Sequence, residues 1–268
     1  MKGMSRVLGV FLCLVMAFSG SAFAAETAYI DVSTSSEGYF TVEYDNCRVG
    51  KMKVGVTHNG TTAYYNYTPG EKSSYTFASG DGEYILALYR NVGGTKYRQV
   101  TKTAVTVQME EVMAPYLVST EEITFSEVDA VGVAAAALCK GLGTDADKIV
   151  AIYNDISGRF QYDYRFAALV RSGAVMNYIP DTYLTLKSGK GICYDFSALF
   201  AAMCRSQDIP CAVDKGYLGG VYHAWNMVFL DGEWIAVDVT AAVCGTHTPA
   251  DELSDCVADL SHYTNYTF

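Results

Sequence analysis

Residues 191–196, which read Gly-Ile-Cys-Tyr-Asp-Phe, do the most to decide the fold and chemistry of this chain. Gly189 and Gly191 favour a turn. An apolar run with helical spacing follows, made of Phe196, Leu199, Phe200 and Met203. The pattern therefore predicts that Cys193 lies in or near the first turn of a helix. Unpaired N–H groups and the helix dipole stabilise a thiolate there, and the same N–H groups can hold an oxyanion.

A base and a carboxylate follow this candidate nucleophile in the chain. His223 lies in residues 220–230, where side chains alternate as in a buried strand. Asp231-Gly232 is a strong hairpin signal, so residues 233–239 should run antiparallel beside that strand. Pairing about this turn brings Asp238 close to His223. A carboxylate in that place fixes the tautomer of an imidazole base and stabilises its cation.

The same motifs, taken in order, resemble the transglutaminase-like core. This papain-related superfamily includes animal transglutaminases, bacterial cysteine proteases and peptide N-glycanases. The resemblance covers roughly residues 145 to 245 and is carried by five segments, at 189–196, 205–211, 223–226, 232–234 and 238–240. It implies a papain-like or transglutaminase-like α+β catalytic domain.

The resemblance also implies roles for individual residues. Cys193 corresponds to the nucleophile, His223 to the base and acid, and Asp238 to the orienting carboxylate. Members of the superfamily add an aromatic or Gln oxyanion donor upstream of the cysteine. No clean motif marks that donor here, and Tyr183 and Tyr164 are the candidates.

Each catalytic candidate also has a plain structural interpretation. A lone cysteine is often a small buried residue, a strand histidine often belongs to the core, and an aspartate late in a strand often forms a turn. The order of the three residues and the hairpin favour catalysis. No metal or cofactor is expected, because the chain has four His and lacks Cys-x-x-Cys and His-x-x-x-His spacings.

Residues 1–24 have the pattern of a secretory signal peptide. Lys2 and Arg6 form a basic start, residues 7–18 an apolar run, and Ala22-Phe23-Ala24 a cleavage site. The apolar run is too short to span a bilayer, which needs about 20 residues. The mature protein is therefore expected to have no membrane span and to be exported from a bacterium, as a secreted, extracellular or cell-surface protein.

Charge and cysteine content limit the partners further. The formal net charge is −10, and removing Lys2 and Arg6 with the signal peptide would make it −12. That charge argues against nucleic acid and anionic membranes, whereas cationic cell-wall peptides or exported proteins fit better. Of eight cysteines, Cys13 lies in the signal peptide, which leaves seven. An odd number leaves one thiol free, and Cys244 with Cys256 is the pairing we favour for any disulfide.

Two domains are predicted after the signal peptide. Residues 25–112 show about seven short strands, which suggests an immunoglobulin-like or fibronectin-like sandwich. The expected strands are 39–44, 52–57, 63–67, 74–77, 84–90, 96–101 and 104–108. Residues 115–268 form the transglutaminase-like domain, with helices expected near 131–138 and 149–156. Their capping signals are Ser126 with Asp129 and Thr144 with Asp147. Residues 164–188 should form a long loop with short helical pieces that walls the active-site groove.

The leading functional hypothesis is an exported cysteine enzyme that acts on amide bonds of protein or peptide substrates through a thioester. We favour hydrolysis over crosslinking, because water is the default acceptor. The alternative is a non-catalytic cell-surface protein that binds glycans or proteins and keeps only the fold. Residues 25–110 offer no nucleophile–base pair, so the first domain should position or recruit substrate.

Overall fold

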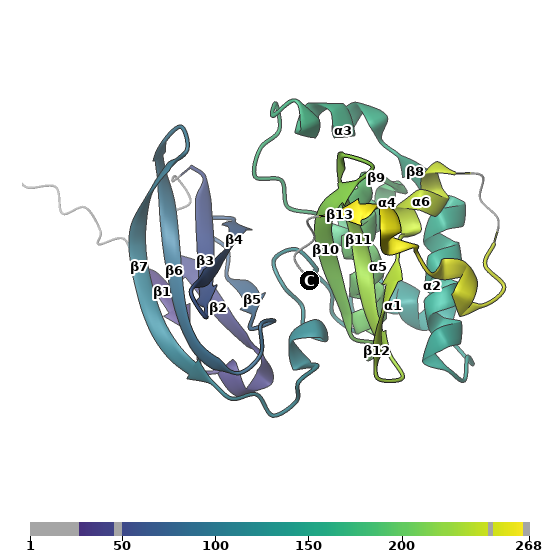
Figure 1. Ribbon diagram of the computed structural model, residues 1–268, viewed down its shortest axis with the longest axis horizontal. Helices are drawn as coiled ribbons and strands as arrows, with labels where there is room; N and C mark the ends of the chain where they lie inside the picture. Colours follow the sequence, from purple (N-terminus) through teal and green to yellow (C-terminus); the bar gives the residue numbers. More distant parts are fainter. Residues whose placement is uncertain (1–26, 46–49, 246–248, 265–268) are drawn as a thin grey trace, which may run out of the picture.

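The computed structural model describes residues 27–45, 50–245 and 249–264. The predicted signal peptide, residues 1–24, and Cys47 lie outside these ranges. Figure 1 shows a β-sheet region at the N-terminal end, followed by a region in which helices pack against a further sheet. Within the described ranges, no helix is both long and apolar enough to cross a membrane.

The N-terminal region consists of two antiparallel sheets, with strand orders β1-β2-β5 and β4-β3-β6-β7. The strands are β1 Ala28–Asp31, β2 Tyr39–Tyr44, β3 Met52–His58, β4 Thr61–Tyr67, β5 Ser73–Thr76, β6 Gly82–Gly93 and β7 Lys96–Val107. The segments predicted separately at 96–101 and 104–108 form the single strand β7. Lys102 and Thr103 pair with β6 without a break, so the prediction of two strands was wrong. Strand β1 was not predicted, because the first strand expected from the sequence begins at residue 39.

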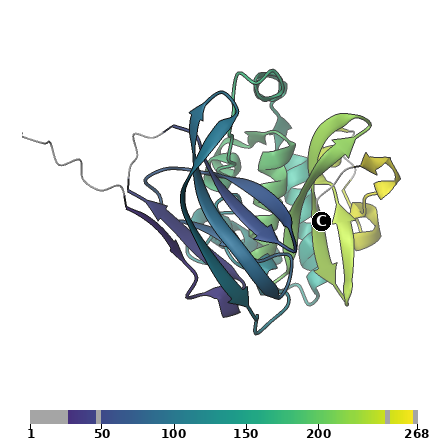
Figure 2. The ribbon, with the colours of Figure 1, turned by 60° about the vertical axis from the view of Figure 1, so that its left-hand side comes forward.

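One hydrophobic core lies between the two sheets. Successive side chains of a strand point to opposite faces, so alternate residues enter this core. Phe40, Val42 and Tyr44 of β2 meet Leu86 and Leu88 of β6 there, all fully buried. In Figure 2, the purple strands β1 and β2 lie in a different layer from the long strands β6 and β7. The predicted β-sheet region is present, while its assignment to the immunoglobulin or fibronectin class stays a prediction.

The rest of the chain is mixed α/β, with helices packed on an antiparallel sheet of order β12-β11-β10-β13. The helices are α1 Ala130–Cys139, α2 Asp145–Arg159, α3 Tyr164–Arg171, α4 Thr182–Ser188, α5 Cys193–Arg205 and α6 Val239–Cys244. The strands are β8 Gln161–Tyr162, β9 Lys190–Gly191, β10 Cys211–Leu218, β11 Val221–Leu230, β12 Glu233–Val237 and β13 Tyr263–Thr264. Short 3-10 helices cover Ser35–Glu37, Ala114–Tyr116, Leu253–Cys256 and Leu260–His262.

The first two helices of this part start at side-chain caps. Thr144 Oγ1 accepts a hydrogen bond from the backbone N–H of Asp147, as the predicted capping signal requires. At α1 the cap is Asp129, whose Oδ1 accepts the N–H groups of Val131 and Gly132. The sequence suggested Ser126 as the cap, but Ser126 acts as a donor instead. Its own N–H donates to Asp129 Oδ2 at 2.7 Å.

Helix α5 is the central element of this part. It contacts α1, α2, α4, β10 and β11, and its residues 195–205 are all buried. The buried Asn226 of β11 joins the helix to the sheet, because its Nδ2 donates to Ser197 O at 2.9 Å and to Ala212 O at 3.2 Å. Two features hold α5 in one position on β11. They are the burial of its apolar side chains and the hydrogen bonds of the Asn226 amide.

A buried guanidinium joins the linking segment to the end of α5. Arg205 Nε donates to Cys211 O at 2.8 Å, and its Nη1 donates to Val118 O at 2.6 Å. Burial is the main cause that lowers the pKa of Arg205, to about 10. The segment between the sheets and α1 is therefore tied to the second part of the chain.

Replacing this guanidinium should destabilise the fold. In Arg205→Met the buried carbonyl of Cys211 and the partly buried carbonyl of Val118 lose their donor, which should lower the free energy of unfolding by about 1–3 kcal/mol. Arg165→Met is a matched control, because Arg165 is exposed. Urea unfolding of the full chain measures both changes, and equal midpoints for the two variants would contradict the role given to Arg205.

Candidate active site

Cys193 is the first residue of α5, as the sequence predicted. The start of the helix is fixed by Asp195, which is 2 % exposed. Its Oδ2 accepts the backbone N–H of Ile192 at 2.8 Å, and its Oδ1 accepts the hydroxyl of Tyr178. Gly191 is required beside it, because a Cβ at that position would lie 2.6 Å from the Asp195 Cβ. The helix start and its thiol thus have a defined position.

The structure brings His223 and Asp238 together. His223 lies in β11, and its Nε2 is 2.7 Å from Asp238 Oδ2. The predicted hairpin forms, but β12 ends at Val237, so the strand expected over residues 233–239 is too long. Asp238 begins α6 instead, because its Oδ1 accepts the backbone N–H of Ala241 at 3.1 Å.

The electrostatics of His223 favour its charged form. Burial, the largest effect, lowers the pKa of His223, but hydrogen bonds and charge interactions with Asp238 and Cys193 outweigh it and raise the pKa from 6.5 to about 9. Because Nε2 is engaged with Asp238, Nδ1 is the ring nitrogen left for the thiol. The three side chains can therefore act as a nucleophile, a base and an orienting carboxylate.

Tyr263 is a fourth member of this group that the sequence did not indicate. Its buried hydroxyl donates to Asp238 Oδ2 at 2.7 Å, the same oxygen that His223 contacts. Its ring packs edge-on against Trp225, with centroids 4.8 Å apart. Tyr263 belongs to β13, which pairs with β10 over only two residues. A strand this short has no periodicity that a sequence pattern could reveal.

Neither predicted oxyanion donor lies in the cleft. Tyr183 is 49 % exposed on α4, where Lys187 lies over its ring. Tyr164 is 69 % exposed at the start of α3 and interacts with Cys244. The better candidate is Tyr162, because β8 pairs in parallel with β9 and aligns Tyr162 with Gly191, two residues before the nucleophile.

The surroundings of Tyr162 fit that role. Burial is the largest cause that raises its pKa, to about 12, so its hydroxyl stays protonated and can donate. A hydrogen bond with the backbone of Cys193 acts in the opposite direction, which places the hydroxyl beside the first N–H of α5. The only sequence signal that was available is an aromatic residue shortly before the loop predicted from residue 164.

Cys193, His223 and Tyr162 open into one cleft of about 680 Å³. The segment predicted to wall the groove does so, since Ala167, Val170, Arg171, Val175, Asn177 and Tyr178 line the cleft. The N-terminal sheets also contribute to the lining, with Lys53, Tyr64 and Asn66. The cleft is thus bounded by both parts of the chain.

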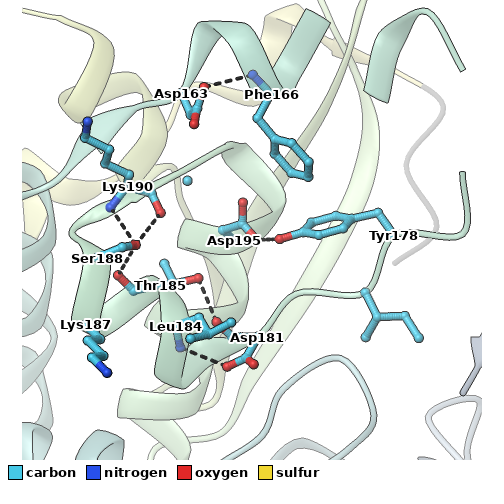
Figure 3. A pocket seen from close by; sticks show the side chains of 12 residues that line it. Asp163, Phe166, Tyr178, Asp181, Leu184, Thr185, Lys187, Ser188, Lys190 and Asp195 are labelled. Atoms are coloured by element: carbon cyan, nitrogen blue, oxygen red, sulfur yellow. Dashed lines mark hydrogen bonds between the residues drawn. The ribbon is translucent and has the colours of Figure 1, made fainter. Parts of the chain in front are cut away.

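A second pocket, of about 740 Å³, lies on the other side of Tyr178. Figure 3 shows the hydroxyl of Tyr178 joined to Asp195 there, with Asp163 and Asp181 capping the nearby helices. This pocket is lined by neither Cys193 nor His223. The cleft is therefore the candidate active site. In the part of the chain that the structure describes, no cluster of three or more His, Cys, Asp or Glu could hold a metal ion.

The favoured disulfide is not formed. Cys244 and Cys256 are both free thiols. Cys256 is buried in the core shared with α2 and α5, while Cys244 is exposed at the end of α6. The expectation rested on the short polar segment between them, but packing places the two thiols in different environments.

Comparison with known proteins matches residues 134–239 to the transglutaminase-like superfamily. Kyphoscoliosis peptidase of Homo sapiens and of Mus musculus are each 29 % identical over 109 residues, which is 36 % of this chain and 16 % of those proteins. The solved structure of a TGase is 22 % identical, and the match covers 45 % of this chain and 32 % of the TGase chain, with a TM-score of 0.33. A Cytophaga hutchinsonii protein assigned as a cysteine protease is 15 % identical, and the match covers 76 % of this chain and 80 % of that protein, with a TM-score of 0.42.

The titration of His223 should depend on the thiol. In Cys193→Ala the hydrogen bond and the charge that raise its pKa are lost, so His223 should titrate below the value of about 9 expected for the parent chain. NMR titration of the imidazole measures this shift, and the resonances of His58 provide the internal control. An unchanged His223 titration would contradict the interaction between the Cys193 thiol and the His223 imidazole.

The same shift predicts a pH dependence of stability. The folded pKa of about 9 exceeds the unfolded value of 6.5, so the folded state binds the proton more tightly. This contribution to the free energy of unfolding is complete below pH 6.5 and is lost as the pH rises to 9. Urea midpoints of the parent chain and His223→Gln should converge over that interval.

Tyr263→Phe should raise the pKa of His223 further, because the Asp238 oxygen no longer shares its charge with a hydroxyl. The ring contact with Trp225 is kept in this variant. Tyr217→Phe serves as the control, since Tyr217 is 40 % exposed and does not line the cleft. A lower His223 pKa in Tyr263→Phe would contradict the effect assigned to the Tyr263 hydroxyl on the charge of Asp238.

Proposed function

Because residues 134–239 form a transglutaminase-like domain, we propose that this chain is an exported cysteine enzyme that cleaves amide bonds of protein or peptide substrates. The observation that carries the proposal is the 2.7 Å contact of His223 with Asp238, in the cleft that also holds Cys193. An imidazole oriented by a carboxylate is what a thiol nucleophile needs as its base. Export is proposed from the sequence of residues 1–24.

In the first half-reaction, the thiol proton of Cys193 first passes to His223 Nδ1, because the raised pKa of this imidazole favours its charged form. The thiolate sulfur then bonds to the amide carbon. The carbonyl oxygen becomes an oxyanion, which the backbone N–H of Cys193 and the Tyr162 hydroxyl are suited to hold. The C–N bond then breaks as the imidazolium protonates the leaving amine. A thioester on Cys193 remains.

In the second half-reaction, water attacks the thioester carbon and gives a proton to His223. The C–S bond breaks, the acid is released, and the imidazolium returns its proton to the sulfur. Asp238 stabilises the imidazolium in both halves, because it contacts Nε2 throughout. A lysine amine in place of water would crosslink two substrates. We favour hydrolysis, since water is the acceptor unless a site excludes it.

Substitution of the three residues tests this function. Cys193→Ala and His223→Ala should abolish turnover, and Asp238→Asn should lower kcat by several orders of magnitude by favouring the wrong tautomer. A mixed peptide library is incubated with the full chain, and mass spectrometry measures new amine ends and the thioester trapped on Cys193. Cys244→Ala is the matched control, an exposed thiol outside the cleft that should leave turnover unchanged.

Substantial turnover by Cys193→Ala would end the cysteine-enzyme proposal. The competing proposal is a binding protein that keeps the fold without catalysis. Iodoacetamide at mildly acidic pH separates the two, because an activated thiol reacts fast and at one position. Slow alkylation of Cys193, no faster than that of Cys244, would favour the binding protein.

A further inference from the structure

The N-terminal sheets build one wall of the cleft that holds Cys193 and His223. Lys53 of β3 and the neighbouring Tyr64 and Asn66 of β4 line it. In Figure 1, β4 lies on the side of the N-terminal region that faces the second part of the chain. A substrate bound across the thiol therefore also meets side chains of the first part.

A continuous series of hydrogen bonds fixes this wall relative to the nucleophile. Lys53 Nζ donates to Asn66 Oδ1, and Asn66 Nδ2 donates to the backbone oxygen of Tyr178 at 3.1 Å. The Tyr178 hydroxyl donates to Asp195, which accepts the N–H of the residue before Cys193. The ammonium of Lys53 thus has a defined place with respect to the thiol.

Among the described residues, no carboxylate lies within ion-pair distance of the Lys53 ammonium on this wall. Lys215, across the cleft, is paired with Glu122, since its Nζ lies 2.8 Å from both carboxylate oxygens, and it also donates to Tyr194. For Lys53 the only hydrogen-bond partner found among the described residues is the neutral amide of Asn66. Arg171, which is exposed, adds another cation to the lining. The cleft is cationic in a chain whose net charge is −10.

The environment of Lys53 favours an anionic partner. Burial is the main cause that lowers its pKa, and the nearby charge of Lys215 lowers it further, while Glu122 opposes them. A partly buried ammonium without a carboxylate is costly unless an anion reaches it. A carboxylate brought in by a ligand would supply both the charge and the hydrogen-bond acceptor.

We propose that Lys53 is a specificity residue that binds a carboxylate of the substrate while Cys193 attacks a neighbouring amide. The inference rests on the proposed function, because it takes the cleft as the substrate site. The carboxylate is either an acidic side chain or the free end of a peptide. The first part of the chain thereby selects the substrate for the second part.

Peptide pairs that differ by one charge test the proposal in the full-length protein. One pair carries Glu or Gln at each position near the cleaved amide, and another ends in a free carboxylate or an amide. For one pair, the parent chain should show a ratio of kcat/KM values of about ten in favour of the carboxylate, the effect of one partly desolvated ion pair. The pair that shows the preference identifies the source of the carboxylate.

Lys53→Met should bring that ratio close to one, and Lys53→Arg should restore part of it. The ratio within each pair is the readout, because a general loss of turnover affects both members of a pair alike. Lys51→Met is the matched control, because Lys51 contacts Met176 and does not line the cleft. A preference that survives in Lys53→Met, or that Lys51→Met loses equally, would overturn the proposal.

Failure of the proposed enzymatic function can be distinguished from failure of the carboxylate subsite at Lys53. If no peptide is cleaved, the same pairs are titrated against Cys193→Ala and against Cys193→Ala with Lys53→Met. If the carboxylate peptide binds more tightly than its uncharged partner, and only when Lys53 is present, the result would support the subsite in a non-catalytic cleft. Equal binding of both members of each pair would overturn it.

Discussion

The packing of α5 against β11 is the constraint on which the candidate site depends. The thiol belongs to the first residue of the helix and the imidazole to the strand, so their separation is set by how these two elements meet. Asn226 fixes that meeting with hydrogen bonds from one amide to the helix and to β10. The helix is buried along residues 195–205, and a buried helix cannot shift without opening cavities.

The carboxylate of Asp238 is organised with similar completeness. It begins a helix through Ala241, orients His223, and accepts the hydroxyl of Tyr263. These contacts come from three separate elements, so the position of the carboxylate is determined by their packing and not by the hairpin alone. A charge held by several donors also keeps its orientation when the imidazole gains or loses a proton.

The sequence predicted the parts of this site that have local signals. Cys193 follows a glycine turn and an apolar helical run, and the Asp231-Gly232 turn indicated the strand pair beside His223. Tyr162 and Tyr263 were missed because their strands are two residues long and their neighbours are distant in the sequence. Lys53 lies in a strand that was predicted, but it was missed because only the docking of the N-terminal sheets brings it into the cleft.

The place of Tyr263 in the chain has a consequence for biosynthesis. The ribosome adds this residue after Cys193, His223 and Asp238, and domains form from the N-terminal end as the chain emerges. Until Tyr263 is made and β13 pairs with β10, Asp238 lacks one of its donors and Trp225 lacks the ring packed against it. A nascent chain therefore carries the thiol and the imidazole before their surroundings are complete.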